Sequence, residues 1–537
     1  MQLLRFMVVA RRVIVAEPFA ESGLAVLREA GIEVDSLVGK PRDALIVALE
    51  GADGLIVRSE TRVDRELLAA GRRLVAVARA GVGVDAIDVD AATQAGIVVL
   101  NTPSANTLAA TEQTFALMLA LIRHTVDAAL SLREGRWDRR SFVGTELYGK
   151  TLGIVGLGRI GANVAQRAKA FGMKIIAHDP FITQARADAF DATLLTLEEL
   201  LQRSDIVTLH MALGERTRGL IRRRELDLLR PHAYLINCAR GGLIDEEDLL
   251  AALEAGKLAG AGIDVVAQEP PPPGGTGARL HRHPKVVSTP HLGGSTVEAL
   301  ERIAVELAQD LARVLLGSPA AGAVNAPTFG GAEGERMRPF VETAYRMGRF
   351  YPQYARPASL PTFAFVAEGE LSNLSPEPLV TSFLSGLLQG TTDRRVTIVN
   401  ARTIAEELGV RIEARTETRG SSAYAATLRV HAGPTTIVGT VAGGSPRIVE
   451  LDGFEIDAIP IGGMVITKHR DVPGMIGKVG TILGDADVNI STMQVSRTQD
   501  AGGDAIMVLG VDRRAPTDAL ERLGAIQGIS AVHAIEI

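Results

Sequence analysis

Cysteine is almost absent from this chain, which has one among its 537 residues, Cys238. A single thiol excludes a disulfide framework, and no Cys/His cluster has the spacing of a zinc site. The net charge of −6 is small for this length, so it gives no general attraction to nucleic acid or to an anionic membrane. We therefore expect a cytoplasmic protein with no metal, no nucleic-acid partner and no membrane partner.

Long apolar runs are missing as well. The longest apolar helical run, Phe115–Ile122, is too short to span a bilayer. The N-terminus, MQLLRFMVVARR, lacks a clear signal-peptide cleavage site, and we interpret it as an irregular extension or an early start codon. There is no P-loop, no nucleophile-elbow serine and no internal repeat. The basic clusters Arg222–Arg224 and Arg279–Pro284, the second with His281 and His283, are expected to be solvated surface.

What the sequence does have is a glycine motif within Thr151–Asp179. An apolar run enters Gly156-x-Gly158-x-x-Gly161, a helical pattern follows, and a second apolar run ends at Asp179. This context suits a dinucleotide fingerprint, because the glycines permit a tight turn, a close pyrophosphate and the packing of helix on strand. The helix start attracts the anion, and Asp179 would bind a ribose 2′-hydroxyl but repel a 2′-phosphate. The motif predicts NAD rather than NADP; a plain βαβ unit with glycine turns is the alternative.

Apolar strand-like runs alternate with helical patterns on both sides of this motif. They lie at Arg12–Ala16, Gly54–Val57, Leu74–Ala78, Ile97–Leu100, Ile206–His210, Ala233–Cys238, Gly260–Val265 and Val286–Ser288. Such alternation predicts parallel sheets with helices on both faces. Because the cofactor unit begins in the middle of the chain, we expect it to be inserted in the first unit, with Thr107–Arg123 as the crossing helix.

The pattern changes after a predicted helix at Ser295–Leu316. Gly317–Phe329 is rich in Ala, Gly and Pro, and we interpret it as a linker. Residues 330–458 mix helices and strands without a glycine fingerprint, and Met464–Ile537 shows the order strand, helix, strand, strand, helix, strand, which is ferredoxin-like. The predicted domains are 12–106 with 297–317, 107–296, 318–458 and 459–537.

Three side chains on loops after these strands could perform hydride chemistry on a hydroxy acid. Arg240, in NCARGG, could hold a substrate carboxylate through its guanidinium fork. His291, in TPHLGG, is the acid/base candidate, and Glu269, in AQEP, could orient its ring and raise its pKa. The alternatives are a solvated turn arginine, a satisfied core histidine and an ordinary loop acid.

At these residues the sequence resembles the D-isomer-specific 2-hydroxy acid dehydrogenases. The resemblance covers residues 12–316 and rests on the glycine fingerprint together with Arg58-Ser59-x-Thr61, Arg79 to Asp85, Asn101-x-Pro103, NCARGG, Gly262 to Val265, QEP and TPHLGGST. It implies a Rossmann-type doubly wound NAD domain inserted in a flavodoxin-like substrate domain. It also implies catalytic roles for Arg240, Glu269 and His291, and NAD contacts at Val82, Gly156, Gly158, Arg159, Ile160, Gly161, Asp179, Met211, Cys238, Ala239, Arg240, Asp264, His291, Gly293 and Gly294.

Within that family the chain resembles the long members that oxidise 3-phospho-D-glycerate to 3-phosphooxypyruvate and so open the phosphorylated route to L-serine. The same resemblance places substrate contacts at Arg58, Ser59, Arg62 and Asn106, where arginines suit a phosphate. Two rivals stay open: a dehydrogenase of another D-2-hydroxy acid such as 2-hydroxyglutarate, and a non-catalytic NAD-sensing regulator. Ala86 stands where the family usually has asparagine, and Ala212 where it usually has proline.

The C-terminal half resembles an α+β intervening, allosteric substrate-binding domain followed by a ferredoxin-like ACT domain, a module that often binds amino acids between subunits. This likeness implies L-serine as an effector held by His469, Asp471 and Asn489, although each is also an ordinary loop residue. The intervening segment has no obvious dense basic cluster, which leaves its own ligand open. By the same analogy we expect a homo-oligomer, a dimer or tetramer, with an interface near Thr107–Arg123 and Trp137.

Overall fold

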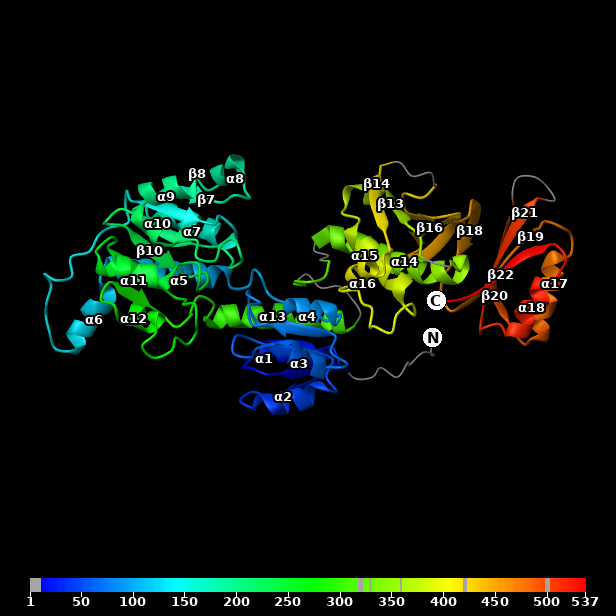
Figure 1. Cartoon of the computed structure of the whole chain (residues 1–537), viewed down its shortest axis with the longest axis horizontal. Helices are drawn as coiled ribbons and strands as arrows, with labels where there is room; N and C mark the ends of the chain where they lie inside the picture. Colours follow the sequence, from blue (N-terminus) through cyan, green and yellow to red (C-terminus); the bar gives the residue numbers. More distant parts are fainter. Residues whose placement is uncertain (1–10, 317–321, 328–330, 358–359, 419–422, 498–502) are drawn as a thin grey trace.

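The structure is a computed structural model that describes residues 11–316, 322–327, 331–357, 360–418, 423–497 and 503–537. It consists of two α/β domains and, beyond them, two α+β domains, arranged as an elongated molecule (Figure 1). The α/β prediction with its inserted NAD domain is confirmed, and so is the α+β character of the C-terminal half. The exact domain boundaries stay predictions.

The first domain is a parallel five-stranded sheet with the order β2-β1-β3-β4-β5, the flavodoxin-like order. Its strands are β1 Arg12–Val15, β2 Glu33–Ser36, β3 Gly54–Val57, β4 Ala76–Arg79 and β5 Val98–Leu100, and its helices are α1 Glu21–Glu29, α2 Arg42–Leu49, α3 Arg65–Ala70 and α4 Val89–Gln94. The four apolar runs predicted in this part of the chain form the inner strands β1, β3 and β4 and the edge strand β5. The sequence pattern missed β2, whose residues are mostly exposed and therefore carry no apolar run.

The second domain is a parallel seven-stranded sheet with the order β12-β11-β10-β9-β6-β7-β8. Its strands are β6 Thr151–Val155, β7 Lys174–His178, β8 Ala192–Leu194, β9 Ile206–Leu209, β10 Tyr234–Asn237, β11 Gly260–Ile263 and β12 Val286–Ser288. Its helices after the crossing are α6 Thr125–Arg133, α7 Arg159–Ala170, α8 Gln184–Asp188, α9 Leu197–Arg203, α10 Arg223–Asp227, α11 Glu246–Glu254 and α12 Thr276–Arg282. From β6 the chain adds β7 and β8 on one side and then β9 to β12 on the other, so the strand order reverses between β6 and β9. At such a switch point a ligand is expected beyond the carboxyl ends of the strands.

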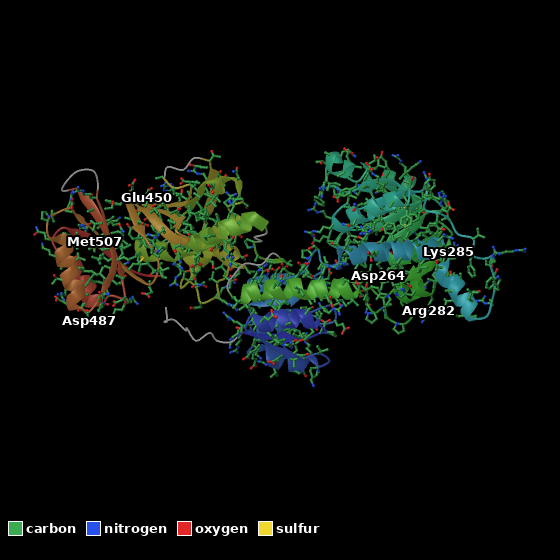
Figure 2. All side chains as sticks on the ribbon, turned by 180° about the vertical axis from the view of Figure 1, so that it is seen from behind. Asp264, Arg282, Lys285, Glu450, Asp487 and Met507 are labelled. Atoms are coloured by element: carbon green, nitrogen blue, oxygen red, sulfur yellow. The ribbon has the colours of Figure 1, made fainter. Side chains whose placement is uncertain are left out.

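Two long helices join these domains (Figure 1). The predicted crossing helix is α5, Thr107–Ile122, and α13, Val297–Leu315, leads back and packs on α1, β4 and β5. Among the described residues no single helix is long and apolar enough to cross a membrane; α5 and α6 reach that length and composition only together, across a 64° bend. Arg282, in the predicted solvated basic cluster, is exposed at the surface of the second domain, as expected, and Lys285 just beyond the cluster is exposed too (Figure 2). His281 differs from the expectation, because its Nδ1 is buried.

The third domain has a six-stranded mixed sheet with the order β14-β13-β15-β16-β17-β18. Its elements are α14 Gly331–Ala355, β13 Phe363–Gly369, the 3₁₀ helix η1 Glu370–Asn373, α15 Glu377–Leu388, α16 Ala401–Glu407, β14 Ile412–Glu417, β15 Ala426–Ala432, β16 Thr435–Ala442, β17 Ser445–Leu451 and β18 Phe454–Ala458. The fourth has the predicted ferredoxin-like order: β19 Gly463–Arg470, α17 Met475–Asp485, β20 Ile490–Arg497, β21 Asp504–Val511, α18 Thr517–Gly524 and β22 Ile529–Glu536. Its antiparallel sheet runs β20-β21-β19-β22.

The third and fourth domains share one hydrophobic core. Ile466, Val508 and Ile535, on one face of the fourth sheet, are buried in the same cluster as Phe350 and Leu451 of the third domain. The opposite face of the fourth sheet packs on its own helices through residues such as Met507 (Figure 2). One face of the fourth sheet is therefore covered by the third domain and the other by the helices of the fourth domain, so the two domains form one continuous body.

The predicted linker is partly ordered against the first domain. Ala323 bridges to Leu100, and the Asn325 side-chain amide accepts from Val99 N at 2.8 Å and donates to the Ile97 carbonyl at 3.0 Å. Residues 317–321 and 328–329 of the predicted linker lie outside the described residues. The composition of Gly317–Phe329 gave no sign of these contacts, which depend on one asparagine side chain that both donates and accepts at the edge strand β5.

A loop of the third domain also contacts the first domain. The Arg395 guanidinium donates to the Leu74 carbonyl at 2.8 Å, and the Thr397 hydroxyl donates to the Gly96 carbonyl at 3.1 Å. Val399 is buried in the core beside β4 and β5. Through this loop the described part of the C-terminal half is attached to the first domain.

Candidate active site

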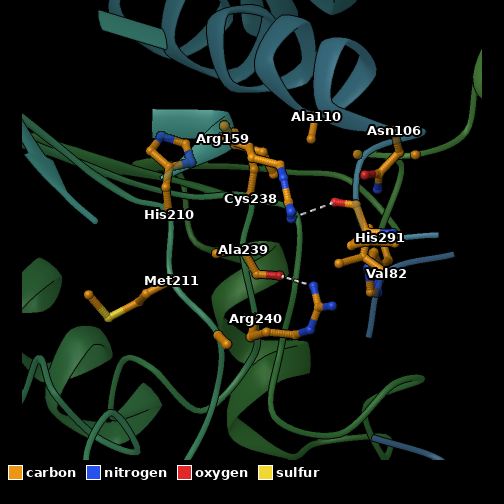
Figure 3. A pocket seen from close by; sticks show the side chains of 15 residues that line it. Val82, Asn106, Ala110, Arg159, His210, Met211, Cys238, Ala239, Arg240 and His291 are labelled. Carbon is orange, nitrogen blue, oxygen red and sulfur yellow. Dashed lines mark hydrogen bonds between the residues drawn. The ribbon is translucent and has the colours of Figure 1, made fainter. Parts of the chain in front are cut away.

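A cavity of about 270 Å³ lies between the first two domains, where their strands end (Figure 3). Residues of both domains line it: Val82, Pro103, Asn106, Ala110, Arg159, Ile160, His210, Met211, Ala212, Cys238, Ala239, Arg240, His291, Gly293 and Gly294. The structure therefore gathers most of the predicted NAD contacts, two of the three predicted catalytic residues and one predicted substrate residue around one space.

His291 and Glu269 form a direct pair. Nδ1 of His291 lies 2.6 Å from Oε2 of Glu269, while Oε1 of Glu269 accepts from Val266 N at 3.1 Å. Burial alone would raise the pKa of Glu269, but the hydrogen bond and charge of His291 bring this pKa below its ordinary value. A carboxylate on Nδ1 orients the ring and leaves Nε2 as the atom that can exchange a proton with a ligand.

Asp264 supports the loop that carries His291. Its Oδ1 accepts from the Thr289 hydroxyl at 2.5 Å and from Leu292 N at 2.8 Å, and its Oδ2 accepts from Gly293 N at 2.8 Å. The residue is almost fully buried, at 2% exposure, and is not among the cavity-lining residues. Asp264, predicted as an NAD contact, thus lies beneath the loop, and both of its carboxylate oxygens accept hydrogen bonds from loop residues.

Arg240 lies at the end of β10, opposite His291 in the cavity (Figure 3). Its Nη1 donates to the Ala239 carbonyl at 2.7 Å, and its Nε lies 3.3 Å from Asp85 Oδ2, across the gap between the two domains. The Asp85 carboxylate is 60% exposed, so this ion pair is weak and leaves the guanidinium able to engage a ligand.

Arg79 lies at the end of β4, and its sequence motif alone gives it no individual role. Burial and the neighbouring Arg240 lower the pKa of Arg79 to about 10, and Arg58 adds to the effect. Its Nε donates to the Arg58 carbonyl at 3.1 Å. Three guanidinium groups therefore gather beside the cavity, and an anionic ligand would relieve their mutual repulsion.

The predicted substrate residues are not all brought into the cavity. Asn106 lines it, and its Oδ1 is buried with no hydrogen-bond partner among the described residues. Arg58, Ser59 and Arg62 do not line it: Arg58 is half-buried beside it, whereas Ser59 and Arg62 are exposed. The orphaned Asn106 oxygen marks a place where a bound molecule would donate a hydrogen bond.

The glycine fingerprint has the shape that a dinucleotide needs. Gly156 has φ +93°, and a Cβ there would lie 2.5 Å from the His210 carbonyl oxygen. A Cβ on Gly161 would lie 2.1 Å from the Gly156 carbonyl oxygen, whereas one on Gly158, the N-cap of α7, would meet nothing within 4 Å. The first and third glycines are thus required by the fold, and the second leaves open space at a helix N-terminus, which suits a pyrophosphate.

Asp179 directly follows β7, beside this loop. Its Oδ2 accepts from Leu157 N at 2.9 Å, its Oδ1 accepts from Phe181 N at 2.9 Å, and the residue is half-buried. Each oxygen keeps a lone pair, so the carboxylate can still accept from a ribose hydroxyl.

Two further groups in the cavity wall are held neutral. Burial lowers the pKa of His210 to about 3, and its Nε2 lies 2.9 Å from the Thr208 hydroxyl. Burial, followed by the charge of Asp264, raises the pKa of the Cys238 thiol. His210 directly follows the buried strand β9, and this position at a strand end is the sequence signal that places it near the cofactor, although no motif assigns it a role.

The predicted effector residues do not meet within one chain. His469 pairs with Ala505 near one end of the fourth sheet, where Asp471 forms an ion pair with Arg497 at 3.1 Å. Asn489 precedes Ile490, which pairs with Val511 at the opposite end. His469 is also buried, which lowers its pKa. A single ligand could touch all three only if a second copy supplied one of them.

Comparison with known proteins agrees with this architecture. Residues 115–293 match the family of D-isomer specific 2-hydroxyacid dehydrogenases (NAD binding domain), residues 336–452 the D-3-phosphoglycerate dehydrogenase intervening domain, and residues 463–528 the ACT domain. The D-3-phosphoglycerate dehydrogenase of Synechocystis sp. is 40% identical over 98% of this chain and 95% of its own, and that of Bacillus subtilis is 39% identical over 98% and 99%. The chain belongs to the D-3-phosphoglycerate dehydrogenase family. NAD is therefore its cofactor, as the fingerprint predicted.

Two solved structures each match a little under three fifths of the chain. The TT0316 protein of Thermus thermophilus is 39% identical with a TM-score of 0.54, covering 58% of this chain and 99% of that one. The D-lactate dehydrogenase of Aquifex aeolicus, complexed with NAD and lactic acid, is 26% identical with a TM-score of 0.53, covering 59% and 100%. Each of these two solved chains is thus matched almost completely by less than two thirds of this chain.

Proposed function

We propose that the chain oxidises 3-phospho-D-glycerate to 3-phosphooxypyruvate with NAD, the first step of the phosphorylated route to L-serine. One observation carries the proposal: the His291–Glu269 pair faces Arg240 in a cavity that Arg58 and Arg79 flank with further positive charge. A substrate with a carboxylate, a hydroxyl and a phosphate needs such a set of groups. Family membership over nearly the full chain supports the same substrate.

In the proposed mechanism Arg240 holds the substrate carboxylate, and Asn106 Oδ1 accepts a hydrogen bond from the bound substrate or cofactor. Arg58, with Arg62 nearby, attracts the phosphate. Nε2 of His291 takes the hydroxyl proton, and Glu269 stabilises the imidazolium that forms. The bound nicotinamide supplies the hydride acceptor. Asp264 keeps the His291 loop in place throughout.

The test is NADH production, followed by absorbance, from 3-phosphoglycerate and from unphosphorylated D-2-hydroxy acids such as 2-hydroxyglutarate. We expect the phosphorylated acid to have the higher kcat/KM. A higher value for an unphosphorylated acid would contradict the substrate assignment while keeping the reaction class. No NADH from any of these acids would favour an NAD-sensing regulator.

We also propose that L-serine binds between the ACT domains of two copies and inhibits the enzyme. This arrangement would bring His469 and Asp471 of one copy near Asn489 of another. The edge strand β20 supports it, because Met493 and Val495 there are exposed at 45% and 43%. Serine titration of wild type and Asn489→Ala tests it: we expect the variant to lose inhibition, and unchanged inhibition would contradict the site.

The second proposed contact between copies lies near α6. Trp137 is 80% exposed beside a hollow of about 410 Å³ that Leu132 and Phe142 also line. An exposed apolar patch of this kind favours self-association. Sedimentation of wild type and Trp137→Glu measures the oligomeric state, and we expect the variant to shift to a smaller species; an unchanged species would contradict the interface.

A further inference from the structure

A buried carboxylate, Glu17, holds the loop from which Arg58 and Arg62 project. Glu17 follows β1 and is 5% exposed. Its Oε1 accepts from Arg58 N at 2.8 Å and Thr61 N at 2.9 Å. Its Oε2 accepts from the two backbone N–H groups between them, Ser59 N and Glu60 N, each at 3.1 Å. Every backbone N–H from residue 58 to residue 61 therefore points at one carboxylate.

Successive backbone N–H groups that converge in this way form a nest, which is an anion-binding arrangement. In this protein the nest already holds an anion of the chain itself. Although burial alone would raise the pKa of Glu17, the N–H groups of Arg58, Glu60 and Thr61 lower it below its ordinary value, so the carboxylate stays charged. The backbone N–H groups of residues 58–61 are consequently not free to donate hydrogen bonds to a substrate phosphate.

The other side of the loop is fixed by Arg79. Its Nε donates to the Arg58 carbonyl at 3.1 Å. Its guanidinium packs so closely on Gly81 that a Cβ there would lie 1.6 Å from Nη1. The backbone at Arg58 is thus held by Glu17 through its N–H and by Arg79 through its carbonyl, and only side chains remain free to reach a ligand.

We propose that Glu17 is a positioning residue, which fills the nest of the 58–61 loop so that arginine side chains, and not the loop backbone, bind the substrate phosphate. The proposal rests on the proposed function, because it assumes a phosphorylated substrate. It assigns Glu17 no contact with substrate or cofactor. Because Glu17 acts through the position of Arg58, its loss should weaken substrate binding and leave the rate of the chemical step unchanged.

Two substitutions at Glu17 test this role in the full-length enzyme. Glu17→Gln keeps the volume, but its NH₂ group cannot accept, so two of the N–H groups lose their partner. Glu17→Ala empties the nest. Leaving buried donors unsatisfied should raise the KM for 3-phosphoglycerate about tenfold or more in both variants, with kcat and the KM for NAD within about twofold of wild type.

Chemical rescue separates positioning from general damage. Acetate can enter the emptied nest of Glu17→Ala and accept from the same N–H groups, so it should lower the KM of this variant toward the wild-type value. It should not rescue Glu17→Gln, whose side chain still fills the space. Rescue of neither variant, or equal rescue of both, would contradict the proposal.

Asp53→Asn is the matched control. Asp53 is a second buried carboxylate of the same sheet, at its opposite end, where it accepts from Arg12 N at 3.0 Å and Arg11 Nη1 at 2.9 Å. This variant should lose stability with its KM for 3-phosphoglycerate unchanged. A wild-type KM in the Glu17 variants, or an equal rise in Asp53→Asn, would overturn the proposal. Absence of NADH from 3-phosphoglycerate with wild-type enzyme would instead be a failure of the proposed function.

Discussion

The His291 imidazole is the group on which proposed turnover depends most. His291→Asn keeps a similar volume but cannot take the hydroxyl proton, so we expect kcat to fall about 10²–10⁴-fold. The NAD dissociation constant, measured by calorimetry, should change little. His283→Asn, on the basic surface loop outside the cavity, should behave as wild type. A His291→Asn enzyme with near-normal kcat would remove the acid/base role.

Glu269 should make stability depend on pH in a defined direction. Its pKa in the folded protein lies below the ordinary 4.5, because the interactions with His291 outweigh the effect of burial. The ionised side chain therefore stabilises the fold above that ordinary pKa, and the contribution is lost as pH falls through the lowered value. Urea unfolding of wild type and Glu269→Gln should show a stability difference at pH 7 that shrinks toward pH 3. A difference that does not change with pH would contradict the pairing.

Single residues were predictable where chemistry follows a local pattern. Arg240, Glu269 and His291 each follow a strand and stand in a distinctive motif, and the structure brings them together. Glu17 and the role of Arg79 were not predictable in this way. Their importance comes from a loop about 40 residues away from Glu17 in the chain, and no spacing rule links a buried acid to backbone N–H groups at that separation.

The βαβ unit of β6, α7 and β7 tolerates change at its three glycines to very different degrees. Gly161→Ala would press a methyl group against the Gly156 carbonyl, so we expect a loss of about 1–3 kcal/mol in unfolding free energy. Gly158→Ala meets nothing in the protein and should keep its stability, yet bind NAD more weakly. Denaturant unfolding and NAD calorimetry on both variants check this. Normal NAD affinity in Gly158→Ala would place the pyrophosphate elsewhere.

Elements were predictable to the extent that they bury an apolar face. Strands β1, β3, β9 and β11 are buried along their whole length or nearly so, and each appears as an apolar run. Strand β2 is mostly exposed, and pairing with β1 gives it its structure. The Ala323–Asn325 segment was equally hard to predict. It is held against β5 by the side-chain amide of Asn325, and it has no periodic apolar pattern.

The whole molecule should respond unequally to two truncations. Ending the chain after Pro327 leaves every strand and helix of both α/β domains in place, so this form should fold and bind NAD. Ending it after Ala458 removes Ile466, Val508 and Ile535 from a shared core and exposes the apolar face beneath them. We expect the longer form to unfold at a lower temperature than the full chain, or to aggregate, as measured by scanning calorimetry and size exclusion. Equal thermal stability of that form and the full chain would contradict the single C-terminal body.

The attachment of the C-terminal half to the first domain has a mechanical consequence. A cleft between two domains can close on its ligand by rotation about a hinge, and here α5 and α13 are the helices that link the two domains. The contacts of Arg395 and Thr397 attach the C-terminal half to the first domain, so a rotation of that domain would carry the C-terminal half with it. Cleft closure would then change the radius of gyration of the molecule. A ligand that binds the C-terminal half and restrains its movement would slow turnover without touching the cleft.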